Sequence, residues 1–519
     1  MRSFIQRHGS KILGVLSGFD RLVFRGNIRQ IAGTKGMSGF LNWHGILLKH
    51  FGEYAESVTE RVKAAAAVTL RKAGRRGVEY LNSPQINKEE RALAIAREDN
   101  VTEGLICVLS ATELCHTFFV YRNRETRKIE LRTQKRPGLH LYFYMFDRTF
   151  GFMNARILTW LPLRIQVCIN GREWLSRRLD RAGIDYERRD NTFAQVGDVK
   201  RAQAMLRRQL RTDWAKQLTR LAQILNPHHE DKDLFGEGRV LDYYWSVYQS
   251  EFATDCMFES PAALARIYPG IVHHGITTFS SADVMRFLGR RIQSNFNGEI
   301  VSDFKNRPEG VRVKHSVDMN SVKVYDKQGS VLRVETTINQ PRVFRAFRRA
   351  EGQPKGPKRW RYMRRGIADL RRRAEVSEAS NKRYLDALAA VQDPRLVGDV
   401  LRPLAKRVRW KKRTARALTF SERDVAIVAA VMRGEHGIAG FRNKDLQQHL
   451  FANPARSPKE RRRRTALVTR LIRVLRAHRL ISKIAKSHRY RVTRNGVVAM
   501  AAILTTQRVT LERLGNAAA

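Results

Sequence analysis

The 519-residue sequence predicts a multidomain α+β protein, in which a body of mixed helices and antiparallel sheet precedes a basic, mainly helical C-terminal domain. Three observations predict this class. Apolar residues recur every three or four positions in some segments, as on one face of a helix. In other, shorter runs they alternate at every second position, as in half-buried strands. The length also fits about three domains of roughly 100–200 residues each.

The first region, residues 1–100, is predicted to be mainly helical. Residues 64–73 are rich in alanine, and the helical pattern KEERALAIAR at 88–97 follows the turn-forming residues 82–84.

Residues 101–350 are predicted to form an α/β body with two β blocks. The first block is a series of short β-rich runs, at 105–109, 117–121, 128–132, 139–146, 152–160 and 164–169. One apolar stripe predicts a continuous helix over 196–225, and shorter helices are expected at 172–182, 260–266 and 282–288. The second block comprises 311–315, 321–326 and 331–338, and a glycine-containing hairpin turn joins the last two.

Residues 351–415 are predicted to be a basic linker and a helix. Between positions 341 and 373 the chain carries thirteen Lys and Arg residues against Glu351 and Asp369, and Gly and Pro interrupt the pattern over 352–357. Helical periodicity returns over 368–390. The basic, unpatterned stretch at 408–417 marks the expected boundary of the C-terminal domain.

The C-terminal domain, residues 416–519, shows the clearest order of elements: helix, short helix, long helix, two-stranded ribbon, helix. Ser421 is the expected N-cap of the first helix, and Pro458 opens the third. The third helix carries a leucine-rich stripe, and we expect Arg470, Arg473 and Arg476 on a separate, exposed side.

This region resembles the winged helix-turn-helix of MarR-type bacterial regulators, so the predicted fold ends in a C-terminal winged helix-turn-helix domain. The most specific stretch, LIRVLRAHRLISKIAKSHRYRVTRNG, has a leucine-rich helix, a Leu-Ile exit, a basic hairpin and a Tyr-x-x-Thr-x-x-Gly pattern. The resemblance implies that the third helix enters a DNA major groove and that the hairpin, or wing, touches the backbone or minor groove. It adds Lys483, Lys486 and Arg489 to the three arginines as nucleic-acid-binding residues. Protein docking is the alternative role of such a domain.

The whole sequence also resembles a bacterial family of uncharacterised open reading frames, and that resemblance implies no activity. MarR-type regulators are short dimers, whereas about four hundred residues precede the domain in this chain. A dimer is therefore one expected oligomeric state, which the sequence alone leaves open.

The formal net charge is +49, from 98 Lys and Arg against 49 Asp and Glu. A charge of this size destabilises a compact state unless a polyanion screens it, so DNA or RNA is the expected partner. Residues 401–519 hold 29 Lys and Arg against 6 Asp and Glu, a surplus of +23.

Other sequence features exclude several classes. The longest apolar stretches fall far short of the ~20 residues that span a bilayer, so no membrane partner is expected. The N-terminus makes a poor signal peptide, which predicts a cytoplasmic protein. Four widely spaced cysteines without a CxxC pair argue against a disulfide scaffold and a finger-type zinc site. Motifs of P-loop, HExxH, GxSxG and GxGxxG type do not occur.

Candidate catalytic residues lie in the second β block, where side chains alternate between an apolar and a mainly cationic face. Tyr325 and Glu335 fall on the cationic face, together with Lys314 and Lys323. A lysine-flanked tyrosine can attack a phosphodiester, and the cations then stabilise the phenolate and the phosphorane charge. Glu335 and Asp303 are the expected ligands of Mg²⁺. We therefore predict Tyr325 and Glu335 as catalytic, and Lys314 and Lys323 as nucleic-acid-binding residues.

Two other catalytic arrangements and a structural one remain open. The segment VKVYDKQGSVLRVE is similar to a hairpin of some phage and plasmid replication initiators, but only adjacent His pairs occur in place of that family's His-hydrophobic-His element. Dispersed carboxylates can also assemble into a two-metal phosphoryl-transfer site, as in RNase H-like nucleases and transposases. These acids are Asp20, Asp147, Asp255, Asp303 and Glu335. In so basic a chain, the same acids can instead pair with arginines in a purely structural role.

The sequence thus predicts a cytoplasmic nucleic-acid-binding protein that docks on DNA through its C-terminal domain. Its body is a candidate Mg²⁺-dependent nuclease or recombinase of a mobile element, although the sequence does not decide whether the protein is an enzyme. A non-enzymatic winged-helix transcriptional regulator and an RNA-binding component of a ribonucleoprotein are the alternatives.

Overall fold

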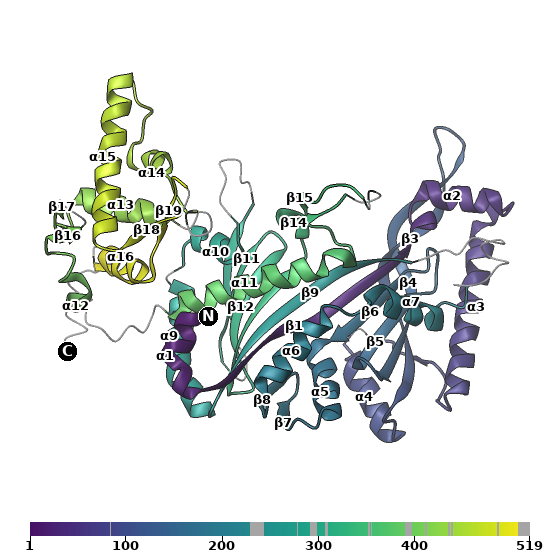
Figure 1. Cartoon of the computed structure of the whole chain (residues 1–519). Helices are drawn as coiled ribbons and strands as arrows, with labels where there is room; N and C mark the ends of the chain where they lie inside the picture. Colours follow the sequence, from purple (N-terminus) through teal and green to yellow (C-terminus); the bar gives the residue numbers. More distant parts are fainter. Residues whose placement is uncertain are drawn as a thin grey trace.

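The computed structural model is a mixed α/β structure built around one large sheet (Figure 1). It describes residues 1–506 apart from 84, 229–242, 278, 291–297, 307–309, 351–352, 354, 390–396, 411–412, 434–435, 437–439 and 485–486.

The sheet has eleven strands among the described residues, in the order β10-β11-β12-β13-β9-β1-β6-β5-β4-β3-β2. The pairing is antiparallel except between β2 and β3, which run parallel. The strands are β1 (Ile12–Ile28), β2 (Glu79–Tyr80), β3 (Gly104–Arg122), β4 (Ile129–Asp147), β5 (Gly151–Leu158), β6 (Ile165–Asn170), β9 (Tyr243–Phe258), β10 (Ile300–Lys305), β11 (Arg312–Val317), β12 (Asn320–Lys327) and β13 (Val331–Ile338).

Among the described residues, helices and two small hairpins pack around this sheet. The helices of the body are α1 (Arg2–His8), α2 (Thr34–Trp43), α3 (Phe51–Lys72), α4 (Lys88–Glu98), α5 (Gly171–Arg181), α6 (Val199–Gln209), α7 (Trp214–Leu225), α9 (Pro261–Thr277), α10 (Ser281–Phe287) and α11 (Leu370–Leu388). The two hairpins are β7 (Tyr186–Arg189) with β8 (Thr192–Val196), and β14 (Arg345–Arg348) with β15 (Arg359–Tyr362). A further hairpin, β16 (Val408–Trp410) with β17 (Arg413–Ala415), lies with the C-terminal elements (Figure 1).

The second β block was predicted correctly, because its apolar alternation matches the packing. Val313, Val322, Val324, Leu332 and Val334 are buried in one cluster with residues of α1, α9, α10 and α11. In Figure 1, α11 lies across this part of the sheet. The predicted helix over 368–390 is thus the element that covers the apolar face.

The central strand, β1, falls in the region that was predicted to be mainly helical. Its side chains are buried almost continuously from Leu16 to Phe24, because elements pack on both of its faces. A strand buried on both faces has no alternation in its sequence, so its period gave no strand signal. β1 also joins residues 1–100 to the main core, where its side chains pack with those of α3 and β6.

Two other element predictions need correction. The helix expected over 196–225 is two helices, α6 and α7, because the Asp213 side chain accepts a hydrogen bond from the Lys216 amide and starts a new helix. The six short runs of the first β block are four strands, β3 to β6, since β3 and β4 form one hairpin of 19-residue strands.

The C-terminal elements follow the predicted order: α13 (Glu422–Met432), α14 (Asn443–Leu450), α15 (Pro458–Ala477), β18 (Ile481–Lys483), β19 (Tyr490–Val492) and α16 (Arg494–Thr506). Their core also includes Leu404 and Leu418, with Val400 and Leu401 of α12 (Val397–Leu401) packed against it. This packing extends the unit to residues before the predicted boundary at 416. We call residues 397–506 the C-terminal unit. Among the described helices of the whole chain, none is both long and apolar enough to cross a membrane.

Candidate functional site

The candidate site lies where three neighbouring strands, β13, β9 and β1, bring acidic side chains together. Glu335 comes from β13, Glu251 from β9 and Asp20 from β1. The register of β1 on β9 shifts between Phe19 and Arg21, so Asp20 occupies a β-bulge. A bulge bends a strand and re-aims a side chain, which accounts for the position of Asp20 beside the acids of β9 and β13.

The carboxyl groups of Asp20, Glu251 and Glu335 form what we call the acidic cluster. Each offers an oxygen that lies within 4.8 Å of the other two. Asp20 and Glu335 are buried, whereas Glu251 is half-buried and is the most exposed of the three. Carboxylates at this spacing disfavour one another's ionisation unless a cation is near. Because Mg²⁺ and Ca²⁺ bind carboxylate oxygens, the acidic cluster has the donor set of a divalent-cation site.

Two residues of β12 hold the Glu335 carboxylate. Lys323 Nζ lies 2.7 Å from Oε1, and the Tyr325 hydroxyl donates a hydrogen bond of 2.9 Å to Oε2. Burial raises the pKa of Glu335; Lys323 opposes this rise, and the carboxylates of Glu251 and Asp20 add to it. Burial and then the Glu335 carboxylate raise the pKa of Tyr325 well above its ordinary value. This geometry favours a role for Tyr325 as a hydrogen-bond donor that orients Glu335. It disfavours a role for Tyr325 as a phenolate nucleophile.

A fourth acid, Asp255 on β9, binds two buried arginines beside the acidic cluster. Arg333 donates to Asp255 from Nε at 2.7 Å and from Nη2 at 2.9 Å, and it reaches Asp20 from Nη1 at 3.2 Å. Arg172, at the start of α5, donates to Asp255 at 2.8 Å. Although burial opposes ionisation, Arg172 and Arg333 hold the pKa of Asp255 below its ordinary value. Asp255 therefore anchors the arginine that holds Asp20.

The turn between β7 and β8 covers this site. Asn191 Nδ2 donates to Asp20 Oδ1 at 2.8 Å, and the Asn191 carbonyl accepts from Arg333 Nη2 at 2.7 Å. Asp190 pairs with Lys327 at 2.6 Å, which ties the same turn to β12. The mainly cationic face predicted for the second β block is consequently buried around Arg333 and does not face solvent there.

The predicted metal pair of Asp303 and Glu335 needs correction. The strand register aligns Asp303, Lys314, Lys323 and Glu335 in one row across β10, β11, β12 and β13. Neighbouring strands lie ~4.8 Å apart, so three steps separate Asp303 from Glu335 by about 14 Å. Asp303 pairs with Arg312 at 3.4 Å, and the half-buried Lys314 lies directly opposite Lys323. Glu335 meets Asp20 and Glu251 instead.

Of the five dispersed acids that the sequence suggested, Asp20, Asp255 and Glu335 lie on the three neighbouring strands. Asp147 ends β4, away from these strands in the sheet order, and pairs with an arginine of α7 at 2.6 Å. Glu251 was missed. The sequence contained a signal for Glu251, because Glu251 and Asp255 are four positions apart on one strand and even spacing places both side chains on the same face.

The long helix α15 carries the three arginines that were predicted to bind nucleic acid. Arg470 and Arg473 are exposed. Arg476 is half-buried, and its guanidinium lies 5.0 Å from the Trp410 ring centroid and 5.6 Å from that of Tyr490. Arg470 and Arg473 are thus available to a partner, while Arg476 packs between two aromatic rings.

The predicted wing residues also differ from one another in exposure to solvent. Lys483 is exposed on β18, whereas Arg489 is half-buried and donates to the Gly440 carbonyl at 3.2 Å. Lys486 lies outside the described residues.

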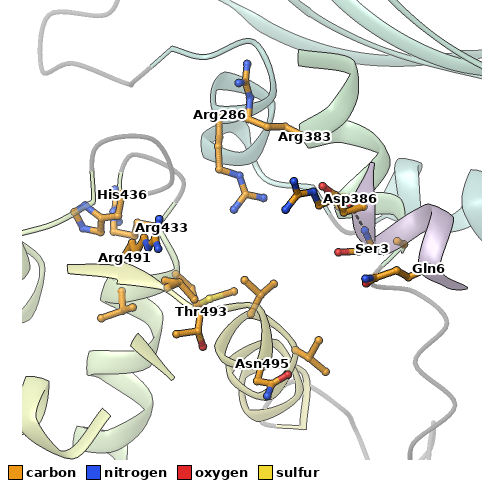
Figure 2. Close-up of a pocket in the computed structure, with 18 of the residues that line it drawn as sticks. Ser3, Gln6, Arg286, Arg383, Asp386, Arg433, His436, Arg491, Thr493 and Asn495 are labelled. Carbon is orange, nitrogen blue, oxygen red and sulfur yellow. Dashed lines mark hydrogen bonds between the residues drawn. The ribbon is translucent and has the colours of Figure 1, made fainter. Parts of the chain in front are cut away.

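A cavity of about 880 Å³ separates the body from the C-terminal unit (Figure 2). Residues of α1, α10 and α11 line one side, and residues of β19, α16 and the end of α13 line the other. Its cationic side chains are Arg2, Arg7, Arg286, Arg383, Arg433 and Arg491. Asp386, an acid in the lining, pairs with the N-terminal amine at 2.5 Å. The positive charge of this lining favours anions.

Comparisons with protein-family models, with curated proteins and with solved structures find no match to this chain. The functional argument therefore depends on the residues described above.

Proposed function

We propose that this protein binds nucleic acid and docks on duplex DNA through a winged helix-turn-helix in its C-terminal unit. The observation that carries the proposal is the pair of exposed arginines on α15, in a unit whose helices and ribbon follow the winged-helix order. Backbone hydrogen bonds of 2.9 and 2.8 Å between Phe441 and Tyr490 tie the segment before α14 to the ribbon. The ribbon and the start of α14 are therefore held together, in an arrangement that can meet a groove and its flanking backbone.

The charge distribution supports the same proposal. Arg461, Arg462 and Arg463 are exposed on the N-terminal half of α15, which projects from the rest of the C-terminal unit in Figure 1. Arg461 and Arg473 lie twelve residues, or about 18 Å, apart along this helix. The three arginines can therefore meet phosphates beside a groove while Arg470 and Arg473 reach base edges within it. The arginine-lined cavity beside the unit adds positive potential on a second side. A non-enzymatic regulator and an RNA-binding role are the alternatives that this charge allows.

Duplex binding by the full-length chain tests the proposal. We expect Arg470→Ala with Arg473→Ala to remove sequence preference and to cost about 1–3 kcal/mol for each side chain that reaches a base edge. Arg71→Ala with Arg97→Ala is the matched control, because both arginines are exposed on helices of the body. If both double variants bind a selected duplex as tightly as wild type does, DNA docking through α15 is wrong.

A second function, metal-dependent cleavage or transfer of phosphodiester strands, is favoured by the acidic cluster. Its three carboxylates have the donor chemistry of a Mg²⁺ or Mn²⁺ site. When bound, such an ion would polarise a phosphate oxygen. Lys323 and Tyr325 would hold Glu335 in place, and Arg333 would hold Asp20.

Glu251→Gln tests this second function, since Glu251 is the most exposed member of the acidic cluster. We expect Mn²⁺ to raise the melting temperature of the wild-type protein and to support cleavage of DNA or RNA, and we expect the variant to lose both effects. Absence of a Mn²⁺ effect and of cleavage in the wild type would leave the acidic cluster as part of a structural ion network.

A further inference from the structure

The β14–β15 hairpin has two different faces. The register places Arg345 opposite Tyr362 and Phe347 opposite Trp360, so these four side chains share one face. On the other face, Ala346 is buried in a small cluster with residues of β13 and α11. One face of the hairpin therefore packs on the body, and the other points away from it.

The outward face is aromatic and exposed. Phe347 is 56% exposed, and Trp360 and Tyr362 are each 60% exposed. The Phe347 and Trp360 rings lie 5.6 Å apart at 53°, and the Arg345 guanidinium lies 3.8 Å from the Tyr362 ring centroid. Single exposed aromatic residues are ordinary, whereas several on one small face mark an interaction site.

Cationic side chains lie close to these rings and in the connection between the two strands. Lys355 and Lys358 are exposed in the connection between the strands, and Arg359, at the start of β15, is exposed on the other face of the hairpin. Arg372 reaches over from α11, with its guanidinium 5.6 Å from the Trp360 ring centroid. Exposed aromatic rings beside exposed cations match a ligand that has flat bases and a phosphate backbone.

We propose that this hairpin face, Arg345, Phe347, Trp360 and Tyr362, stacks on the bases of single-stranded nucleic acid. Bases in a duplex are already stacked on one another and present only their edges, so the rings select unpaired bases. Trp360 and Tyr362 are two residues apart on one strand, or about 6.8 Å. This distance is about twice the 3.4 Å rise per base of a duplex strand, so an extended, unstacked strand fits better. The surface is separate from α15, and in Figure 1 the hairpin stands above α11, apart from the C-terminal helices.

Fluorescence anisotropy of the full-length protein tests the proposal, with labelled 20-nucleotide oligo-dT and oligo-U and a blunt duplex as probes. We expect Trp360→Ala with Tyr362→Ala to weaken single-strand binding at least about fivefold for each stacked base lost. Trp360→Phe keeps a ring and should retain most of the affinity. Tyr80→Ala is the matched control, because Tyr80 is 58% exposed on β2 at the far edge of the sheet.

The result separates this proposal from duplex docking. The hairpin double variant should keep duplex affinity, and Arg470→Ala with Arg473→Ala should keep single-strand affinity. Single-strand binding that is absent in wild type, or equal in the hairpin double variant and in Tyr80→Ala, overturns the proposal. Binding to phosphatidylserine-containing vesicles that the hairpin double variant loses, with oligonucleotide binding unchanged, would assign the face to membranes and overturn it as well.

Discussion

Replacement of Arg333 by methionine is expected to loosen the centre of the sheet. Arg333 is 1% exposed and makes hydrogen bonds to Asp255, Asp20 and the Asn191 carbonyl. Without it, Asp255 keeps Arg172, whereas Asp20 keeps the Asn191 amide. Removal of one partner from a buried ion pair costs about 3–5 kcal/mol, because the remaining charge is buried without compensation.

Hydrogen exchange is the suitable assay, because a chain with several cores does not unfold in one step. A loss of about 3 kcal/mol in local stability speeds amide exchange about 150-fold in the peptides that cover β9 and β13. Arg333→Lys keeps the charge but not the forked geometry, so it should fall between wild type and Arg333→Met. Addition of Asp20→Asn to Arg333→Met should restore part of the protection, since it removes the carboxylate that loses its arginine partner.

Acid pH offers a check on the same network. The folded pKa of Asp255 lies below its ordinary value, so its ion pairs contribute stability above about pH 3.9 that is lost as pH falls through the folded pKa. Arg333→Met removes part of this contribution, so the variant should lose less protection than wild type between pH 5 and pH 3. Exchange rates within about fivefold of wild type at pH 7 would refute the reasoning, because the network would then stabilise no more than a surface ion pair does.

Three further predictions follow from other contacts. The folded pKa of Glu335 is raised, so wild type should gain stability relative to Glu335→Gln as pH falls from 7 to 5, and an unchanged difference in melting temperature would contradict this. The Thr419 amide donates to Asp424 Oδ2 at 2.8 Å, so Asp424→Ala leaves it without this acceptor and should lower local stability by about 1–3 kcal/mol. Amide hydrogen exchange should then be faster in α13 and unchanged in β1. Gly14→Ala places a Cβ 2.6 Å from Val199 Cγ2, so β1 and α6 must move apart and the melting temperature should fall. A melting temperature equal to that of wild type would contradict this prediction.

The parts of the fold that could be predicted are those whose packing leaves a period in the sequence. Val322, Val324, Leu332 and Val334 alternate with polar residues because only one face of their strands meets the apolar core. β1 could not be recognised, because it is buried on both faces. The C-terminal order was readable for the opposite reason, since α14 and α15 leave a polar side to solvent.

The sequence predicted which types of residue form the site better than it predicted which of them contact one another. Asp20, Asp255 and Glu335 were among the acids that one open alternative brought together, but their meeting depends on the strand order β13-β9-β1 and on the bulge at Asp20. Neither is a local property of the sequence. Asp303 was paired with Glu335 on sequence proximity, although two strands lie between β10 and β13. Burial of Arg333 beneath the β7–β8 turn also depends on residues more than a hundred positions away.

The salt dependence of duplex affinity tests the central claim most directly, namely that this chain is a nucleic-acid-binding protein with its main duplex contact on α15. A plot of log K against log salt concentration has a slope of about −0.9 for each phosphate contact. We predict a slope steeper than about −5 for the full-length wild-type protein, as expected for six or more contacts, and a shallower slope for Arg461→Ala with Arg462→Ala. A slope near −2 in the wild type, or one that these substitutions on α15 leave unchanged, would contradict the account.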